Sequence, residues 1–172
     1  MDGTIAYLLW QWQRSAGRLE RRLDGLGDDE FFREPVAGCW NVRPDPGVPG
    51  RWEIDYPWPP PAPPPVTTVA WRLVHLANAN WIYWEHAFGP GRRNFTDLVI
   101  PGGAADAVAD WRASRSPVTA WLETARDDEL AEERPSHLGG TKTYGEVISI
   151  LVDEQTHHAA EIALLRDLYR AG

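Results

Sequence analysis

Apolar residues recur every three or four positions in four stretches of the chain, which is the pattern of amphipathic helices. In the first of these stretches the arginines and the glutamate lie away from the centre of the apolar face. Its apolar positions are Ile5, Leu8, Leu9, Trp12, Ala16, Leu19, Leu23 and Leu26. We expect helices over about 4–26, 67–88, 104–126 and 143–170. Together they predict an all-α four-helix bundle of the up-down-down-up type.

Several residues mark where these helices begin and end. Thr67 or Thr68 can cap the second helix, which Gly89-Pro90-Gly91 ends. The stretch Thr143-Tyr144-Gly145-Glu146 reads as a capping box that opens the fourth helix. Ser116-Pro117 lies inside the third helix, so we expect either a kink or a restart there.

The segment 27–66 interrupts the helical pattern. Glycine and proline recur throughout it, and residues 59–65 form a proline-rich run that favours polyproline conformation. A loop of about 40 residues is long for a compact domain, yet this one is rich in aromatic residues, which a disordered tether would lack. They are Trp40, Trp52, Tyr56 and Trp58. We therefore expect an irregular loop packed over the bundle, either as the wall or lid of a site or as simple surface packing.

The bulk properties narrow the class of protein. The 172 residues fit one domain, 1–172, with a sizeable core. A net charge of -8 without any block of Lys or Arg disfavours a nucleic acid as partner, because phosphate binding needs a clustered basic surface. We expect no membrane contact and no signal peptide, hence a cytoplasmic protein. The lone Cys39 excludes an intrachain disulfide and is most simply a small apolar filler.

A carboxylate and an imidazole lie in the middle of the most apolar stripe of the last helix. The members of the stripe fall within about 80° of arc at about 100° per residue. They are Val147, Leu151, Glu154, His158, Ile162 and Leu165. Burying an ionised carboxylate is costly unless it is paired or binds a metal. Because Glu154 and His158 are one turn apart on the same face, both can bind the same ion.

The second helix offers a third ligand. His75 shares an inward stripe with Trp71, Asn78, Ala79, Ile82 and His86. Two imidazoles and a carboxylate suit zinc, nickel or another borderline divalent ion, and three protein ligands leave a position for water or substrate. His86 cannot share the ion, because it lies roughly 16 Å from His75 along the helix.

Each of these residues also has a simpler interpretation. An inward histidine is more often a hydrogen-bonded core residue than a ligand, and Glu154 with His158 could be an ordinary helix pair. His157 with Glu161 is a competing i, i+4 pair, although His157 lies further from the stripe. From the residues alone, a metal-free helical interaction domain stays open beside a metal site.

Three stretches of this sequence resemble the DinB-like superfamily, within the broad group that includes YfiT-type and mycothiol-dependent enzymes. TTVAWRLVHLANANWIYWEHAF resembles the second helix of that family, with its single histidine ligand. DDEFFREPVAGCWNV resembles the short segment that precedes that helix, and DEQTHHAAEIALLRDLYRAG resembles the closing helix. The likeness spans nearly the whole chain in the right order.

The resemblance implies a metal site made by His75, Glu154 and His158, with zinc expected and nickel as the other candidate. Many members carry histidine where this chain has Glu154, and a glutamate there resembles the mycothiol-dependent maleylpyruvate isomerase type. Members that are understood use the metal to activate a low-molecular-weight thiol, so the resemblance implies a thiol-dependent transferase or isomerase acting on a small molecule. The alternative is a non-catalytic, stress-associated metal-binding bundle that forms dimers.

Several other residues are weaker candidates. Glu161 could orient a ligand or act as a general base, and Asn78 could orient a ligand or bind substrate. Arg166 could anchor an anionic cofactor, although pairing on the helix surface is its simpler role. His137 is most simply a solvated loop residue. A tryptophan set is expected in the core or at the interface of a homodimer: Trp71, Trp81, Trp84 and Trp111.

Overall fold

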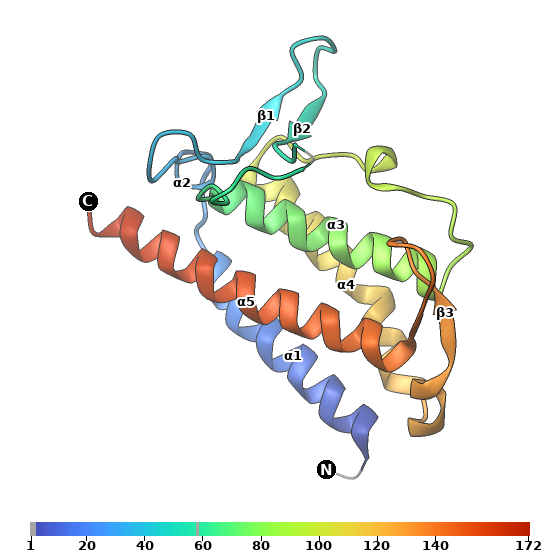
Figure 1. Ribbon diagram of the computed structural model, residues 1–172. Coiled ribbons are helices and arrows are strands. Elements are labelled where there is room, and N and C mark those ends of the chain that lie inside the picture. The colour runs from blue at the N-terminus through green and yellow to red at the C-terminus, as the bar shows by residue number, and fades with distance from the viewer. Residues whose placement is uncertain (1–2, 58) are drawn as a thin grey trace.

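The computed structural model describes residues 3–57 and 59–172, so Trp58 of the expected loop lies outside the described residues. Four long helices form the molecule: α1 (Thr4–Leu23), α3 (Val69–Ala87), α4 (Ala104–Thr124) and α5 (Tyr144–Arg170). Figure 1 shows α1 and α5 running in one direction and α3 and α4 in the other. The prediction of an all-α bundle in the up-down-down-up order is confirmed.

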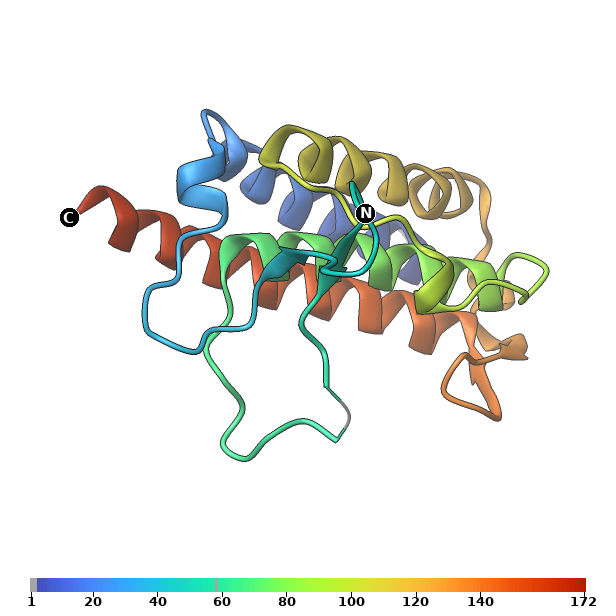
Figure 2. The same cartoon turned by 90° about the horizontal axis from the view of Figure 1, so that it is seen from above.

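Each long helix packs against two neighbours. α1 contacts α4 and α5, and α3 likewise contacts α4 and α5, so the four axes enclose a core that consists of two clusters of buried side chains. Figure 2 shows this arrangement from above, with α3 beside α5. Of the helices in the described part of the chain, none combines the length and the apolar character needed to cross a membrane.

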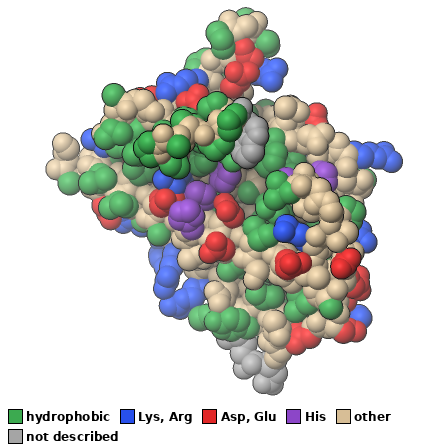
Figure 3. Space-filling model, in the orientation of Figure 1, with side chains coloured by type: hydrophobic (Ala, Val, Ile, Leu, Met, Phe, Trp, Pro, Cys, Tyr) green, Lys and Arg blue, Asp and Glu red, His purple; other side chains and the backbone are tan. Residues whose placement is uncertain are grey.

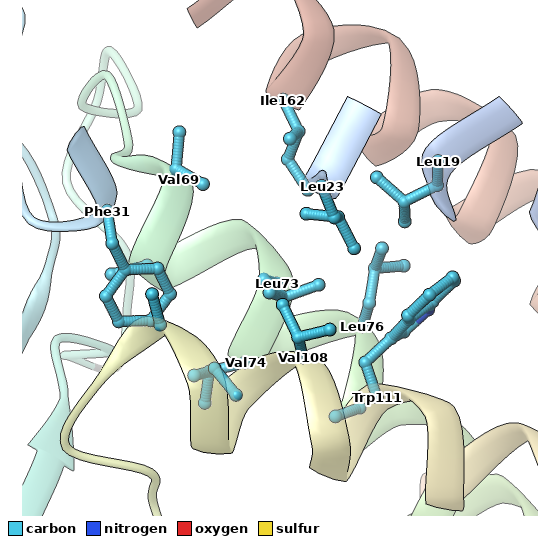
Figure 4. Packing of buried hydrophobic residues seen from close by; sticks show 14 of the residues in the cluster. Leu19, Leu23, Phe31, Val69, Leu73, Val74, Leu76, Val108, Trp111 and Ile162 are labelled. Atoms are coloured by element: carbon cyan, nitrogen blue, oxygen red, sulfur yellow. The ribbon is translucent and has the colours of Figure 1, made fainter. Parts of the chain in front are cut away.

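The core joins side chains from all four long helices and from the short helix α2 (Asp28–Phe31). Figure 4 shows Leu19 of α1, Leu73 of α3, Trp111 of α4 and Ile162 of α5 packed together. All four are fully buried. Complete burial of each aliphatic side chain stabilises the fold by about 1.5–3 kcal/mol, so this cluster holds the two predicted ligand helices at a fixed separation.

The helices α3 and α5 carry their own N-terminal caps. The Thr68 hydroxyl accepts a hydrogen bond from the Trp71 N–H at 3.2 Å. At the start of α5, the Thr143 hydroxyl accepts from the Glu146 N–H at 3.2 Å, while the Glu146 carboxylate accepts from the Thr143 N–H at 2.7 Å. Both predicted caps are confirmed, including the capping box.

The helices α1 and α4 follow Gly3 and Gly103, which have no side chain to cap them, and are capped from elsewhere in the chain. Asp127 accepts hydrogen bonds from the first two N–H groups of α1 at 2.9 and 2.8 Å. Asp28 accepts from the first N–H group of α4 at 2.7 Å. These carboxylates also compensate the positive ends of the two helix dipoles.

The end of α1 and the middle of α4 differ from the sequence-based expectation. α1 ends at Leu23, three residues early, because the carbonyl of the next residue, Asp24, accepts from the buried Arg166 and Gly25 follows with a left-handed φ of 68°. α4 continues through Pro117 without a restart at Ser116. The buried residues Val118 and Leu122 hold the following turn against the core.

The segment 27–66 is more regular than the sequence indicated. It contains α2 and an antiparallel hairpin of β1 (Val42–Pro44) and β2 (Trp52–Ile54), with Val42 opposite Ile54. The rest of its described residues form the expected loop. Strands of three residues are too short to show alternation, which is why the sequence did not indicate this hairpin. A second hairpin pairs β3 (Glu133–Pro135) with β4 (Thr141–Thr143), and two 3₁₀ turns, η1 (Phe95–Asp97) and η2 (Asp127–Ala131), lie in the connections.

The first hairpin is tied to the start of α3. The Trp40 N–H donates to the Val66 carbonyl at 3.0 Å, and the Thr68 N–H donates to the Trp40 carbonyl at 3.0 Å. The Asn41 amide oxygen also accepts from the Thr68 hydroxyl at 2.8 Å. These bonds place the hairpin over the end of α3 that carries His75, as Figure 1 shows.

Candidate metal centre

The structure brings together the three residues that the sequence singled out as metal ligands. His75 Nε2 lies 3.2 Å from Glu154 Oε2, and His158 Nε2 lies 3.3 Å from the same oxygen. All three ligand atoms lie within 4.8 Å of one another. α3 supplies His75 and α5 supplies the other two, from adjacent turns of one face.

These separations fit a single divalent ion. Two ligand atoms about 2.1 Å from a tetrahedral zinc ion are about 3.4 Å apart, close to both distances from Glu154. The donor chemistry fits as well, since imidazole nitrogen and carboxylate oxygen are ligands that zinc and nickel accept. Among the described residues, no fourth histidine, cysteine or carboxylate completes this group.

The protonation states of the ligands also suit metal binding. Hydrogen bonds from His158 and then His75 hold the pKa of Glu154 well below its usual range, so this carboxylate is ionised at neutral pH. Burial lowers the pKa of His158, more strongly than the neighbouring carboxylate raises it. His158 is therefore a neutral imidazole at neutral pH, with one nitrogen lone pair free to bind a cation.

Glu161 fixes the orientation of the His158 ring. Its Oε2 lies 2.8 Å from His158 Nδ1, and the same oxygen accepts from the Arg72 guanidinium. The Arg72 guanidinium also lies 3.0 Å from His158 Nδ1. When an ion takes the lone pair of Nε2, the proton of the neutral ring resides on Nδ1, where Glu161 can accept it. Burial lowers the pKa of Arg72 to about 10, so its positive charge persists at neutral pH and balances Glu161.

His75 is held by aromatic stacking. Its ring centroid lies 4.7 Å from that of Trp71, with an angle of 10° between the planes. Trp71 also meets the His158 ring edge-on at 6.2 Å. Because Trp71 is buried and its Nε1–H donates to the Asp55 carbonyl at 2.6 Å, it offers both imidazoles a fixed surface.

The competing pair seen in the sequence is present on the outer side of the same helix. His157 Nε2 lies 3.2 Å from Glu161 Oε1, and His157, His158 and Glu161 form a second group of clustered ligand atoms. The His157 side chain is 56% exposed, against 8% for His158. Glu161 is also engaged by Arg72, which makes this group a poorer cation site than the first.

The remaining candidate residues include Asn78, His86 and His137. Asn78 follows His75 by one turn, is buried, and has an amide oxygen without a partner among the described residues. His86 donates from Nε2 to the Arg93 carbonyl at 3.0 Å. His137 is half-buried rather than solvated, since its ring meets Tyr83 edge-on at 4.4 Å and His86 at 5.9 Å.

Arg166 serves the fold and does not face the three ligands. Its guanidinium is fully buried and donates two bonds to the Glu30 carboxylate, each 2.7 Å long. Two further bonds go to the carbonyls of Arg22 and Asp24, where α1 ends. The expected pairing on the helix surface is therefore replaced by a buried ion pair, which leaves little donor capacity for an anionic cofactor.

One contributor to the site, Arg72, was missed in the sequence. Arg72 is the single Lys, Arg, Asp or Glu between Val69 and Trp84, and a lone charge on an apolar helix is a signal that it has a buried partner. The aromatic residues of segment 27–66 indicated only a packed loop. The structure places Trp40 beside Trp71 and Tyr56 beside His75. In the space-filling view of Figure 3, histidines lie at the surface between hydrophobic and acidic side chains.

Comparison with known proteins agrees with this architecture. Residues 11–162 match the family model described as the DinB superfamily. A solved structure described as a DinB-like protein from Bacillus cereus ATCC 10987 is 17% identical, with a TM-score of 0.64 over 98% of this chain and 95% of that one. A search of curated proteins found no match.

Proposed function

Since this chain belongs to the DinB superfamily, we propose that it is a metal-dependent enzyme acting through a low-molecular-weight thiol. In this proposal His75, Glu154 and His158 hold one divalent ion, with zinc favoured and nickel as the other candidate. The reaction is a transfer or an isomerisation of a small molecule, with a thiol of the mycothiol type as cosubstrate.

One observation carries the proposal: three ligand atoms cluster together, and among the described residues no fourth protein ligand joins them. A structural zinc site is closed by four protein ligands, whereas a catalytic site keeps a position for water or substrate. The ligands are also partly accessible, with 21% of the His75 side chain and 30% of the Glu154 side chain exposed. A small molecule can therefore reach them.

A bound divalent ion would lower the pKa of a coordinated thiol and so supply a thiolate nucleophile at neutral pH. The charges of the residues around the ion would favour an anionic ligand. Glu154 is ionised, Glu161 is neutralised by Arg72, and both imidazoles are neutral when they bind a cation. A divalent ion would thus leave the site with net positive charge, which favours a thiolate over a neutral thiol.

Metal analysis and turnover test this proposal together. Purified protein should contain close to one zinc or nickel per chain by elemental analysis, and Glu154→Ala should lose it. The metal-loaded protein should then turn over a thiol with a panel of electrophiles and epoxides, and His158→Ala should abolish that turnover. Unchanged activity in His158→Ala would exclude the proposed mechanism.

The non-catalytic alternative shares the metal site and requires a dimer. Of the tryptophans expected at an interface, Trp71 and Trp111 are buried within the chain. Tyr7 and Trp10 of α1 are exposed instead, and they lie on one face with Ala160 and Ala163 of α5. We propose that this face joins two copies of the chain. Sedimentation equilibrium should give a dimer for the wild type and a monomer for Trp10→Glu, and a monomeric wild type would contradict it.

A further inference from the structure

We propose that the exposed ring of Tyr56 and the partly exposed ring of Trp40 form a stacking surface that selects a substrate with a planar, unsaturated or aromatic group. This inference deepens the proposed function and rests on it for the position of the ion. It does not depend on the thiol chemistry, because stacking acts on the part of the ligand that lies away from the ion.

The stacking surface continues directly from the metal ligands. The ring of Tyr56 is almost parallel to that of His75, with an angle of 7° and centroids 6.3 Å apart. It is equally parallel to Trp71, 6.0 Å away. Trp40 adjoins both, at 5.6 Å from Tyr56 and 5.7 Å from Trp71. Four rings therefore form one continuous aromatic surface that begins at a ligand of the ion.

The exposed fraction of each side chain shows which rings are buried and which are accessible to a ligand. Trp71 is 6% exposed and is covered by the others, whereas Tyr56 is 50% exposed. Trp40 is partly exposed. A half-exposed aromatic residue beside a metal centre offers a ligand a flat face at little cost in desolvation.

The polypeptide holds these two rings in place before any ligand arrives. Tyr56 follows Asp55, whose carbonyl accepts from Trp71 Nε1 and whose carboxylate accepts from the Asn41 N–H at 2.8 Å. Trp40 is held by its backbone bonds to Val66 and Thr68. Rigid aromatic surfaces bind flat ligands with little further loss of conformational entropy.

The side chains around the histidines differ in polarity from one side to the other. Figure 3 shows hydrophobic side chains on one side of the histidines and acidic side chains on the other. In the same orientation in Figure 1, this hydrophobic side is the side on which β1 and β2 lie. A ligand would therefore point its flat apolar part toward the hairpin and its charged part toward the ion.

A matched pair of zinc-binding probes tests this inference without requiring turnover. Benzohydroxamate and cyclohexanecarbohydroxamate share the metal-binding group and differ in whether the ring is flat. Calorimetric titration of the zinc-loaded protein should show tighter binding of benzohydroxamate by about 3- to 10-fold, the range expected for one aromatic stacking contact. Tyr56→Leu should reduce this preference to about 1, while acetohydroxamate binds both proteins equally.

Two further variants serve as controls. Tyr56→Phe keeps the ring and should keep the preference. Tyr7→Leu removes an equally exposed tyrosine on α1 and should also keep it. Equal binding of the two probes, or a preference that survives in Tyr56→Leu, would overturn the inference.

The proposed function fails separately. Protein that takes up no ion in elemental analysis would contradict the metal proposal before any probe is added. Protein that holds its zinc and binds both probes equally would contradict the stacking surface alone.

Discussion

Glu161 Oε2 lies 2.8 Å from Nδ1 of His158, while Nε2 on the other side of the same ring lies 3.3 Å from Glu154. One imidazole thus separates two carboxylates with different roles. Glu154 lies at the point where the ion would bind, and Glu161 would accept the Nδ1 proton of His158 when Nε2 binds that ion. Arg72 prevents the second carboxylate from adding net negative charge.

The role of Glu161 predicts a loss of metal affinity without a loss of fold. Glu161→Ala should weaken zinc binding by about 10- to 100-fold, because His158 loses the acceptor that orients its ring. A competition titration against a chromophoric chelator measures this change. Asp153→Ala removes an exposed carboxylate from the same helix and should have little effect. Equal affinity in both variants would show that Glu161 does not orient His158.

Stabilisation by metal should distinguish the two groups of clustered ligand atoms. The first contains His75, and the second contains His157. An ion present at 100 times its Kd stabilises the folded state by about 2.7 kcal/mol, so zinc should raise the Tm of the wild type. His75→Ala should lose this shift. His157→Ala should retain it, because the exposed His157 belongs only to the second group. The opposite result would place the ion between His157 and Glu161.

The buried pair of Glu30 and Arg166 should dominate the electrostatic contribution to stability. Glu30→Ala leaves a fully buried guanidinium without its counter-charge and should lower the free energy of unfolding by about 3–5 kcal/mol in urea denaturation. Glu20→Ala breaks an exposed pair with Arg112 and should cost about 1 kcal/mol or less. Similar losses in the two variants would contradict this difference.

The cap that Asp127 provides for α1 predicts a dependence of stability on pH. Hydrogen bonds from the N–H groups of Ile5 and Thr4 lower the pKa of Asp127. Because the folded pKa is lower than the ordinary value of about 3.9, the cap contributes fully above that value and is lost as pH falls through the lower one. Asp127→Ala should therefore lower Tm at pH 7. Its Tm should converge with that of the wild type in strong acid, and a constant difference down to low pH would exclude the cap.

Local patterns in the sequence predicted the helices and the inward face of α5. The spacing of apolar residues located all four long helices, and threonines at 68 and 143 located two of the starts. The phase of Glu154 and His158 followed from the same periodicity. These features depend on residues within a few turns of one another, which is why they could be read without a structure.

The features that were missed depend on distant partners. The early end of α1 and the burial of Arg166 are one interaction, and its partners are separated by more than a hundred residues. The hairpin of β1 and β2 has strands too short for a period to show. The place of Tyr56 beside His75 follows from that hairpin, so the sequence could indicate an aromatic loop but not which ring adjoins the ligands.

The pattern of caps has a consequence for the order of folding. α3 and α5 carry threonine caps within their own sequence, whereas α1 and α4 depend on carboxylates 122–123 and 76 residues away. Helices with local caps can nucleate before the chain collapses, while those capped at a distance gain their last hydrogen bonds only on docking. The two helices that bear the metal ligands are thus the two that can form first. During refolding of the whole chain, a divalent ion would therefore join α3 and α5 before α1 and α4 dock.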